Sequence, residues 1–252
     1  MSDIQACAEI VLKADPDRFA AVMAAPVAAR EKLFPIHAFA VEVARAPWAS
    51  EEPMIAEMRL QWWRDGLSEI ASGALVSKHE VLSPLSGVLT ADTAKALDGF
   101  VEVRRWDIYK EPFEDDAHLD DYLQQTGGAF YQALCQALGA SDASAGAFGY
   151  AVAVANWLKA VPELEARGRV PLVDGRPDAV RSLAEKAIAS LQSVRRAGID
   201  RAARPAFLAG WQTETILKQV ARSPSRVADG TLGQSEFAKK ASLLMKVALG
   251  RV

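Results

Sequence analysis

The side chains with the clearest capacity for chemistry lie in one segment, Met54–Ile70, which reads MIAEMRLQWWRDGLSEI. At helical spacing one side of this segment is polar and comprises Glu57, Gln61, Arg64 and Asp65. The opposite side is an apolar stripe made by Ala56, Leu60, Trp63, Leu67 and Ile70. We therefore predict a helix that contacts a hydrophobic core and a polar cleft together. In the purely structural alternative, Trp62 is a half-buried flank and both Arg59 and Arg64 are solvated.

A second candidate for ligand contact is the glycine pair Gly127-Gly128, which falls inside the predicted helix 118–138. Glycine costs about 1 kcal/mol relative to alanine in a helix, so the pair indicates that something approaches the backbone closely. The neighbour is either the backbone of another helix or a ligand, and the sequence leaves both interpretations open.

Standard catalytic motifs are absent from the sequence. It contains no phosphate-binding glycine loop, no metal-type Cys/His spacing and no nucleophile elbow, and its three histidines lie in unrelated contexts, at His37, His79 and His118. The acidic pairs Asp115-Asp116 and Asp120-Asp121 lie around a helix start, where carboxylates interact favourably with the helix dipole. We expect a capping role for them.

The elements that must position these residues are helices. Apolar residues recur with a period near 3.6 almost everywhere, and the alternation typical of strands is missing, so the predicted fold class is all-α. Helices are expected over 3–14, over a short stretch after an Asp15 cap, and over 30–45 with a kink near Pro35. The helix that contains Trp62 and Trp63 (the tryptophan helix) is expected to run from a Ser50 cap to 72–73. Further helices are expected over 80–88, from a Thr90 or Asp92 cap to 110, and over 118–138, 145–161, 178–198, 205–222 and 235–247. Pro162 is expected to interrupt its helix, and the segment from there to Asp174 is the best candidate for a functional loop.

Length and composition restrict the class of protein. A chain of 252 residues can bury one sizeable core, so we expect a single domain over residues 1–252. The net charge of −3 provides no basic field for nucleic acid. Cys7 and Cys135 lie in helical patterns far apart in the sequence, which predicts free, buried thiols in a reducing compartment.

The same features bear on localisation. The N-terminal segment shows no secretory signal, and the longest uncharged run, Ala143–Leu158, is shorter than the roughly 20 residues that a membrane span needs. We expect a cytoplasmic protein without a transmembrane segment. Peripheral attachment to the inner membrane stays open, although no basic amphipathic segment argues for it. The richness in alanine and arginine is typical of a bacterial sequence.

Three sequence blocks, in their order along the chain, resemble those of the squalene/phytoene synthases, all-α enzymes that join two prenyl diphosphates head to head. The blocks are LFPIHAF at 33–39 with RLQWWR at 59–64, then Tyr122 through Thr126 to the glycine pair, then NWLK at 156–159 with Glu163 and Gly168-Arg169. The resemblance covers roughly residues 28–172 and implies an isoprenoid-synthase-like helical bundle around a central cavity. The residues that match the wall of that cavity are Phe39, Arg59, Trp62, Trp63, Tyr122, Gly127, Gly128, Asn156, Lys159, Glu163 and Arg169.

The resemblance also implies a magnesium site, and here this chain departs from the family. Aspartates four residues apart on two facing helices would hold the Mg²⁺ that neutralises the diphosphate leaving group. The matching positions are Ala44, Arg45 and Trp48 in the first motif and Ala160 and Leu164 in the second. An arginine of the first block is replaced by Val41. We therefore expect no catalytic residue, no metal ligand and no cofactor, with Mg²⁺ relevant only if unorthodox ligands are used.

Three hypotheses follow. An aspartate-lacking branch of the family assists the assembly of respiratory complex I in mitochondria, and this sequence resembles that branch, also in the segment Arg204–Leu208. The missing aspartates favour a catalytically inactive assembly factor for complex I (NADH:ubiquinone oxidoreductase), with complex I subunits as partners. The second hypothesis is a head-to-head prenyl diphosphate transferase with Glu42, Glu163 or Asp65 as atypical ligands. The third is an isoprenoid or lipid carrier that keeps the apolar cavity without the diphosphate site.

Overall fold

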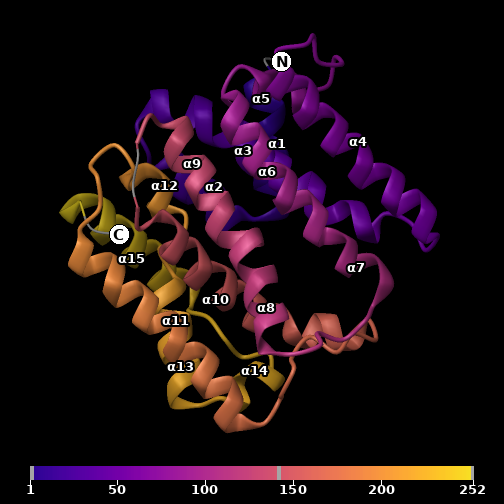
Figure 1. Cartoon of the computed structure of the whole chain (residues 1–252). Coiled ribbons are helices and arrows are strands. Elements are labelled where there is room, and N and C mark those ends of the chain that lie inside the picture. The colour runs from indigo at the N-terminus through magenta and orange to yellow at the C-terminus, as the bar shows by residue number, and fades with distance from the viewer. Residues whose placement is uncertain (1–2, 141–142, 251–252) are drawn as a thin grey trace. The chain divides into compact units, whose positions relative to one another are not determined.

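The computed structural model describes residues 3–140 and 143–250, and every regular element within them is helical, which confirms the all-α prediction. Figure 1 labels the α-helices and colours the chain from the N-terminus to the C-terminus. In chain order the elements are α1 (Asp3–Ala14), α2 (Pro16–Met23), α3 (Val27–Arg45), η1 (Ala46–Trp48), α4 (Pro53–Ser72), α5 (Leu82–Ser86), α6 (Ala91–Glu102), η2 (Val103–Arg105), α7 (Trp106–Tyr109), α8 (Asp116–Leu123), η3 (Gln124–Ala129), α9 (Phe130–Ala137), α10 (Ala145–Ala166), α11 (Pro177–Ala197), α12 (Arg204–Leu208), α13 (Thr213–Arg222), α14 (Ser225–Ala228) and α15 (Glu236–Leu249).

The chain divides into two compact units, each built from discontinuous segments. Unit 1 comprises Met1–Tyr109, Gln132–Ser141 and Asp200–Ala209, and unit 2 comprises Lys110–Tyr131, Asp142–Ile199 and Gly210–Val252. The expectation of one domain over residues 1–252 stays a prediction.

In unit 1, α1 packs against α3, and α4 packs against α6. Helix α3 supplies the centre of the core, since Leu33, Ile36 and Phe39 are fully buried. The helix begins at Val27, before the expected start, and it continues through Pro35. Burial of a continuous apolar face on α3 outweighs the one backbone hydrogen bond that a proline removes.

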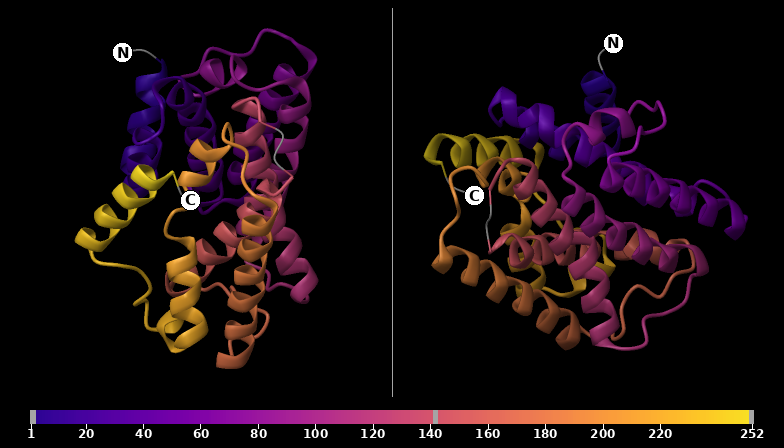
Figure 2. Two further views of the ribbon diagram at one scale, coloured as in Figure 1. Left: turned by 90° about the vertical axis from the view of Figure 1, so that its left-hand side faces the viewer. Right: turned by 45° about the horizontal axis from the view of Figure 1, so that its top comes forward.

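In unit 2, α10 packs against η3 and α11, and α11 packs against α13. Figure 2 shows α11 and α13 side by side. The predicted single helix 118–138 is instead made of α8, η3 and α9, where η3 is a π-helical stretch that contains the glycine pair. Pro162 lies inside α10, so the prediction that it interrupts the helix was wrong. The predicted helix 205–222 is broken into α12 and α13.

Several helix starts are set by local side-chain chemistry. The side chains of Asp15, Thr90 and Asp115 each cap a helix by accepting a hydrogen bond from a backbone N–H, at 2.9, 3.2 and 2.8 Å. The Ser50 cap was predicted wrongly, because Glu52 is the N-cap of α4 and the Ser50 hydroxyl oxygen accepts from the backbone N–H of Glu52. The hydroxyl therefore shapes the turn before the helix.

Two further expectations concern burial and membranes. Cys7 and Cys135 are both buried, and neither forms a disulfide bond, as predicted. Among the helices of residues 3–140 and 143–250, none is long and apolar enough to cross a bilayer.

Candidate functional site

The tryptophan helix has the two faces that its sequence predicts. The apolar stripe from Ala56 to Ile70 is buried throughout, and Trp62 is 38% exposed at its border. Gly66 also lies on the buried side, because a Cβ there would approach the Leu82 side chain to 2.8 Å. The apolar side of the segment Met54–Ile70 therefore packs into the core of unit 1.

Aromatic side chains form one cluster along α4. The ring centroids of Phe39 and Trp63 lie 5.4 Å apart in a T-shaped arrangement, and those of Trp62 and Trp63 lie 4.8 Å apart. His79 contacts both tryptophans, at 4.9 and 5.5 Å. The sequence does not assign His79 to a site, because its position before the short helix α5 gives no local signal for this contact.

Arg64 is held by an ion-pair network within unit 1. Its guanidinium donates to both carboxylate oxygens of Asp98, at 2.7 and 2.9 Å, and also to Glu102 on the same helix, α6. The hydrogen bonds to Asp98 raise the pKa of Arg64. Arg105 extends the network, because it pairs with Glu102 and Glu57. This network fixes α4 on α6, whereas Arg59 is exposed.

The glycine pair of unit 2 marks a close helix contact. A Cβ on Gly127 would lie 2.2 Å from the carbonyl oxygen of Gly149 on α10, and a Cβ on Gly128 would meet the side chain of Gln124. For Gly127 the neighbour is therefore a helix backbone, one of the two alternatives that the sequence left open.

A second aromatic cluster lies in unit 2. Tyr122 and Trp157 have ring centroids 5.1 Å apart, and Phe113 lies within 5.7 Å of both. The indole N–H of Trp157 donates to the carbonyl oxygen of Pro171 at 2.8 Å, which ties α10 to the following loop. Arg169 in that loop is buried.

The polar residues expected along α10 face outward. Asn156, Lys159 and Glu163 are all exposed, and Glu163 pairs with Arg167 at 2.5 Å. Asp120, for which a capping role was expected, instead accepts a hydrogen bond from the Tyr150 hydroxyl at 2.6 Å and pairs with Lys186. The expected site residues thus fall into two groups, one in each unit, and their assignment to one cavity stays a prediction.

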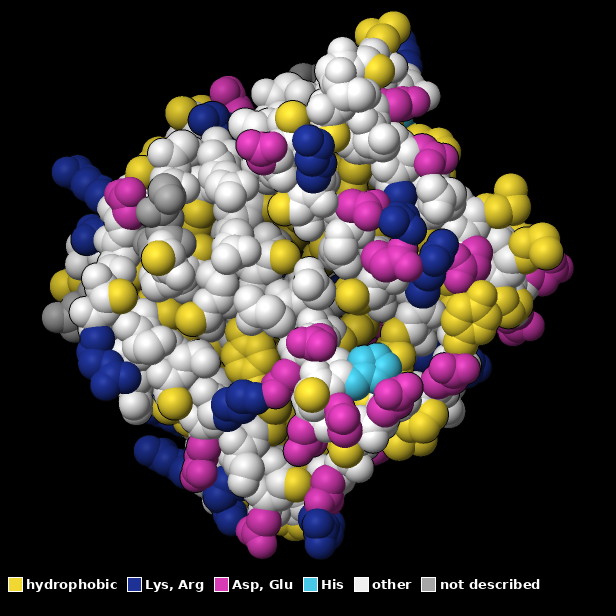
Figure 3. Space-filling view, in the orientation of Figure 1, with side chains coloured by type: hydrophobic (Ala, Val, Ile, Leu, Met, Phe, Trp, Pro, Cys, Tyr) yellow, Lys and Arg dark blue, Asp and Glu magenta, His cyan; other side chains and the backbone are white. Residues whose placement is uncertain are grey.

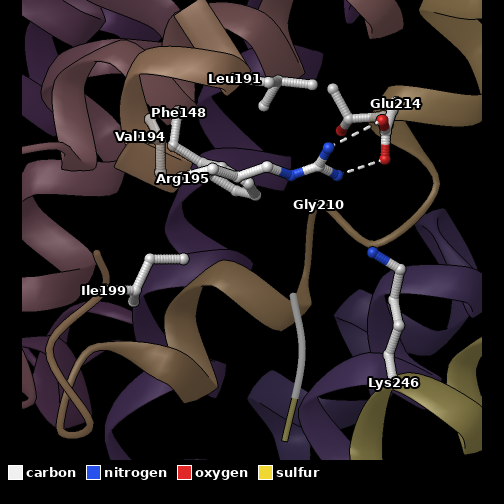
Figure 4. A pocket seen from close by; sticks show the side chains of 9 residues that line it. Phe148, Leu191, Val194, Arg195, Ile199, Gly210, Glu214 and Lys246 are labelled. Carbon is white, nitrogen blue, oxygen red and sulfur yellow. Dashed lines mark hydrogen bonds and ion pairs between the residues drawn. The ribbon is translucent and has the colours of Figure 1, made fainter. Parts of the chain in front are cut away.

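Unit 2 also contains a small cavity that the sequence did not indicate (Figure 4). Its volume is about 30 Å³, and it is lined by Phe148, Leu191, Val194, Arg195, Ile199, Gly210, Thr213, Glu214 and Lys246. Arg195 and Lys218 both pair with Glu214, and the hydrogen bond from Arg195 is the main reason why the pKa of Glu214 falls to about 2. Burial lowers the pKa of Lys246, whose side chain points toward this pair. The Arg195–Glu214 pair joins α11 to α13, and Lys246 comes from α15.

The family is decided by a match that covers more than half of the chain. Residues 11–173 match the family model for squalene/phytoene synthase. The chain belongs to the squalene/phytoene synthase family. This confirms the resemblance carried by the three sequence blocks.

Solved structures of this family share the fold. The chain is similar to a dehydrosqualene synthase solved in complex with a ligand, with a TM-score of 0.75, 17% identity and coverage of 98% of this chain and 96% of the other. It is also similar to squalene synthase HpnC from Alicyclobacillus acidocaldarius, with a TM-score of 0.71, 20% identity and coverage of 88% and 94%. At these identities the likeness establishes the isoprenoid-synthase-like helical fold.

Curated relatives come from the branch named for complex I assembly. The chain is 26% identical over 177 residues to the Drosophila melanogaster protein named NADH dehydrogenase (ubiquinone) complex I, assembly factor 6 homolog. The matching region covers 66% of this chain and 53% of that relative. The chain is 23% identical over 169 residues to the Bos taurus assembly factor 6, with coverage of 65% and 51%. The chain spans about half the length of these relatives.

The magnesium site that this family implies does not fit the residues present. The positions matching the aspartates lie on α3, η1 and α10 and carry no carboxylate, being Ala44, Arg45, Trp48, Ala160 and Leu164. Nearby acids have other partners, since Glu42 pairs with Arg45 at 3.4 Å and Glu163 with Arg167. Over residues 3–140 and 143–250 no group of three or more His, Cys, Asp or Glu side chains is placed to hold a metal ion. The donor set that Mg²⁺ prefers is not assembled from these side chains.

Proposed function

We propose that this chain is a catalytically inactive member of the squalene/phytoene synthase family that acts as an assembly factor for respiratory complex I. The observation that carries the proposal is the replacement of both carboxylate clusters, on α3–η1 and on α10, by Ala44, Arg45, Trp48, Ala160 and Leu164. Without carboxylates at these positions, the leaving diphosphate has no metal to neutralise its charge. The names of the two curated relatives support the assembly role.

The proposed location follows from the proposed role. An assembly factor for a membrane complex works on subunits at the membrane surface, so we place this protein in the bacterial cytoplasm, peripheral to the inner membrane. Its partners are then complex I subunits that await assembly.

Two measurements test this function. The gene is deleted in its host, and NADH:ubiquinone oxidoreductase activity and fully assembled complex I are measured in isolated membranes. We expect both to fall and to return when the intact gene is restored. Normal activity and assembly in the deletion strain would rule out the assembly role.

The second measurement addresses catalysis. Purified protein is incubated with farnesyl or geranylgeranyl diphosphate and Mg²⁺, and released pyrophosphate is followed, with a dehydrosqualene synthase as the positive control. We expect release no faster than without protein. Turnover would overturn the inactive assignment, and a defined lipid that copurifies with the protein would favour a carrier.

A further inference from the structure

Helix α4 exposes an apolar stripe on the side opposite its buried face. The stripe consists of Met54, Met58 and Trp62, which are four residues apart, and the first two are 75% and 67% exposed. Ile55 lies beside it and is 38% exposed. Side chains four residues apart share one helix face, so these residues form a continuous surface. A helix side that faces solvent is ordinarily polar, so an exposed apolar stripe indicates a surface that binds a partner.

One end of the Met54/Met58/Trp62 stripe is fixed in place. Trp62 contacts the ring of Trp63 below it and that of His79 beside it. His79 is itself held, because its Nδ1 accepts from the backbone N–H groups of Val81 and Leu82 at 3.1 and 3.4 Å. The indole is thus preorganised, while the two methionines are flexible, polarisable side chains that adapt to different apolar surfaces.

Acidic residues bracket the stripe. Glu51 and Glu52 come directly before α4 and are exposed. Asp65 and Glu69 follow Met58 and Trp62 by seven residues, or two helical turns, and so continue the same face. Arg59 is exposed at the far edge of the stripe. Figure 3 shows hydrophobic and acidic side chains side by side at its right-hand edge, where α4 begins.

We propose that the Met54/Met58/Trp62 stripe binds an apolar helical segment of another polypeptide that carries lysine or arginine at its ends. The apolar side chains supply the contact area, and the acids at either end of the stripe select a helix with basic flanks. An anionic bilayer surface fits less well, because Glu51, Glu52, Asp65 and Glu69 would face lipid phosphates. A second copy of the same stripe would bring like charges together.

The chemistry of this segment matches one class of protein. Apolar spans of membrane proteins carry an excess of lysine and arginine next to their cytoplasmic ends. Resting on the proposed function, we identify the partner as such a basic-flanked span end in an unassembled membrane subunit.

The binding experiment uses the full chain and a fluorescent helical peptide with an apolar centre and lysines at both ends. The comparison peptide has glutamates in place of the lysines. We expect the lysine peptide to bind about tenfold tighter or better, which corresponds to about 1.4 kcal/mol. The double variant Met54→Ser/Met58→Ser should lose about tenfold of that affinity, and Glu51→Lys/Glu52→Lys should reduce the preference for the lysine peptide. Equal binding of the two peptides, or no binding, would overturn the proposal.

A matched control separates the stripe from apolar exposure in general. Leu75 is 96% exposed in unit 1 outside the stripe, so Leu75→Ser removes apolar surface and should leave peptide affinity unchanged. Unchanged urea midpoints show that the serine variants fold. Binding to anionic vesicles that requires the methionines, or a dimer in sedimentation that the double variant abolishes, would assign the stripe to a membrane or to a second copy and overturn the peptide proposal.

The peptide experiment and the deletion strain can contradict the stripe proposal and the proposed function separately. If the peptides do not bind while the deletion strain lacks complex I, the assembly role stands and the stripe assignment falls. If the lysine peptide binds while complex I is normal without the gene, the stripe stands and its partner is not a complex I subunit.

Discussion

The backbones of Gly127 and Gly149 lie in direct contact within unit 2. A Cβ added to either residue would lie 2.2 Å from the carbonyl oxygen of the other, a separation at which the backbone itself must move. The contact brings η3 and α10 together without any intervening side chain, and the π-helical stretch around Gly127 belongs to the same close approach. The contact explains why glycine is used inside a helix at the cost of backbone entropy.

The first prediction concerns this contact. Gly127→Ala should lower the free energy of unfolding by about 3 kcal/mol or more, because overpacking against rigid backbone cannot be relieved by a side-chain rotation. Urea denaturation followed by circular dichroism measures the change. Gly175→Ala is the control, since a Cβ there meets nothing within 4 Å, and it should change stability by less than about 1 kcal/mol. Similar losses for the two variants would contradict the packing argument.

Features set by neighbouring residues could be predicted from the sequence. The buried stripe of α4, the Asp15 and Asp115 caps and the break at Gly73 all depend on residues within a few positions of one another. The family blocks were recognisable for the same reason, because they are short and keep their order. The local rule failed at Pro162, where the hydrophobic burial of α10 carries the helix past the proline.

Features that join distant segments could not be predicted. Gly149 was the missing half of the Gly127 contact, and nothing in the sequence relates the two positions beyond the glycine itself. The partners of Arg64 are 34 and 38 residues away, and the four-residue spacing of Asp98 and Glu102 was the available signal for a cation facing α6. Which distant residues pair depends on tertiary packing, and this cannot be read from the local pattern of a single sequence.

The second prediction separates the two arginines of α4. Arg64→Met should cost about 1–2 kcal/mol of stability, because it removes the guanidinium that pairs with Asp98 and leaves Glu102 with Arg105. Arg59→Met should change stability by no more than about 0.5 kcal/mol, since Arg59 is exposed. Thermal and urea unfolding of both variants provide the comparison.

A double-mutant cycle checks the cause of the Arg64 effect. Combined with Asp98→Asn, Arg64→Met should cost clearly less than the sum of the single changes, because the two residues share one interaction. Additive losses would show that the Arg64 side chain acts through its packing alone.

The third prediction is a pH dependence. The pKa of Glu214 lies at about 2, below its ordinary value of 4.5, chiefly because Arg195 hydrogen-bonds to the carboxylate. A carboxyl group whose pKa is lower in the folded state contributes stability above pH 4.5, and that contribution is lost as pH falls toward 2. Glu214→Gln should therefore be less stable than the native chain at pH 6, and the difference should shrink between pH 4.5 and 2. A difference that stays constant over this range would show that the charge of Glu214 contributes nothing.

The last prediction concerns thiol reactivity. Cys7 is fully buried, its Sγ donates to the carbonyl oxygen of Glu80 at 3.4 Å, and burial raises its pKa from 9.0 to about 12. Three pKa units lower the thiolate fraction about a thousandfold at neutral pH, and only the thiolate reacts with a disulfide reagent. In a Cys135→Ser variant, which isolates this thiol, the reagent should therefore react with Cys7 only in the unfolded chain. Adding urea should accelerate the reaction in proportion to the unfolded fraction, and rapid labelling of the native chain would mean that α1 opens locally.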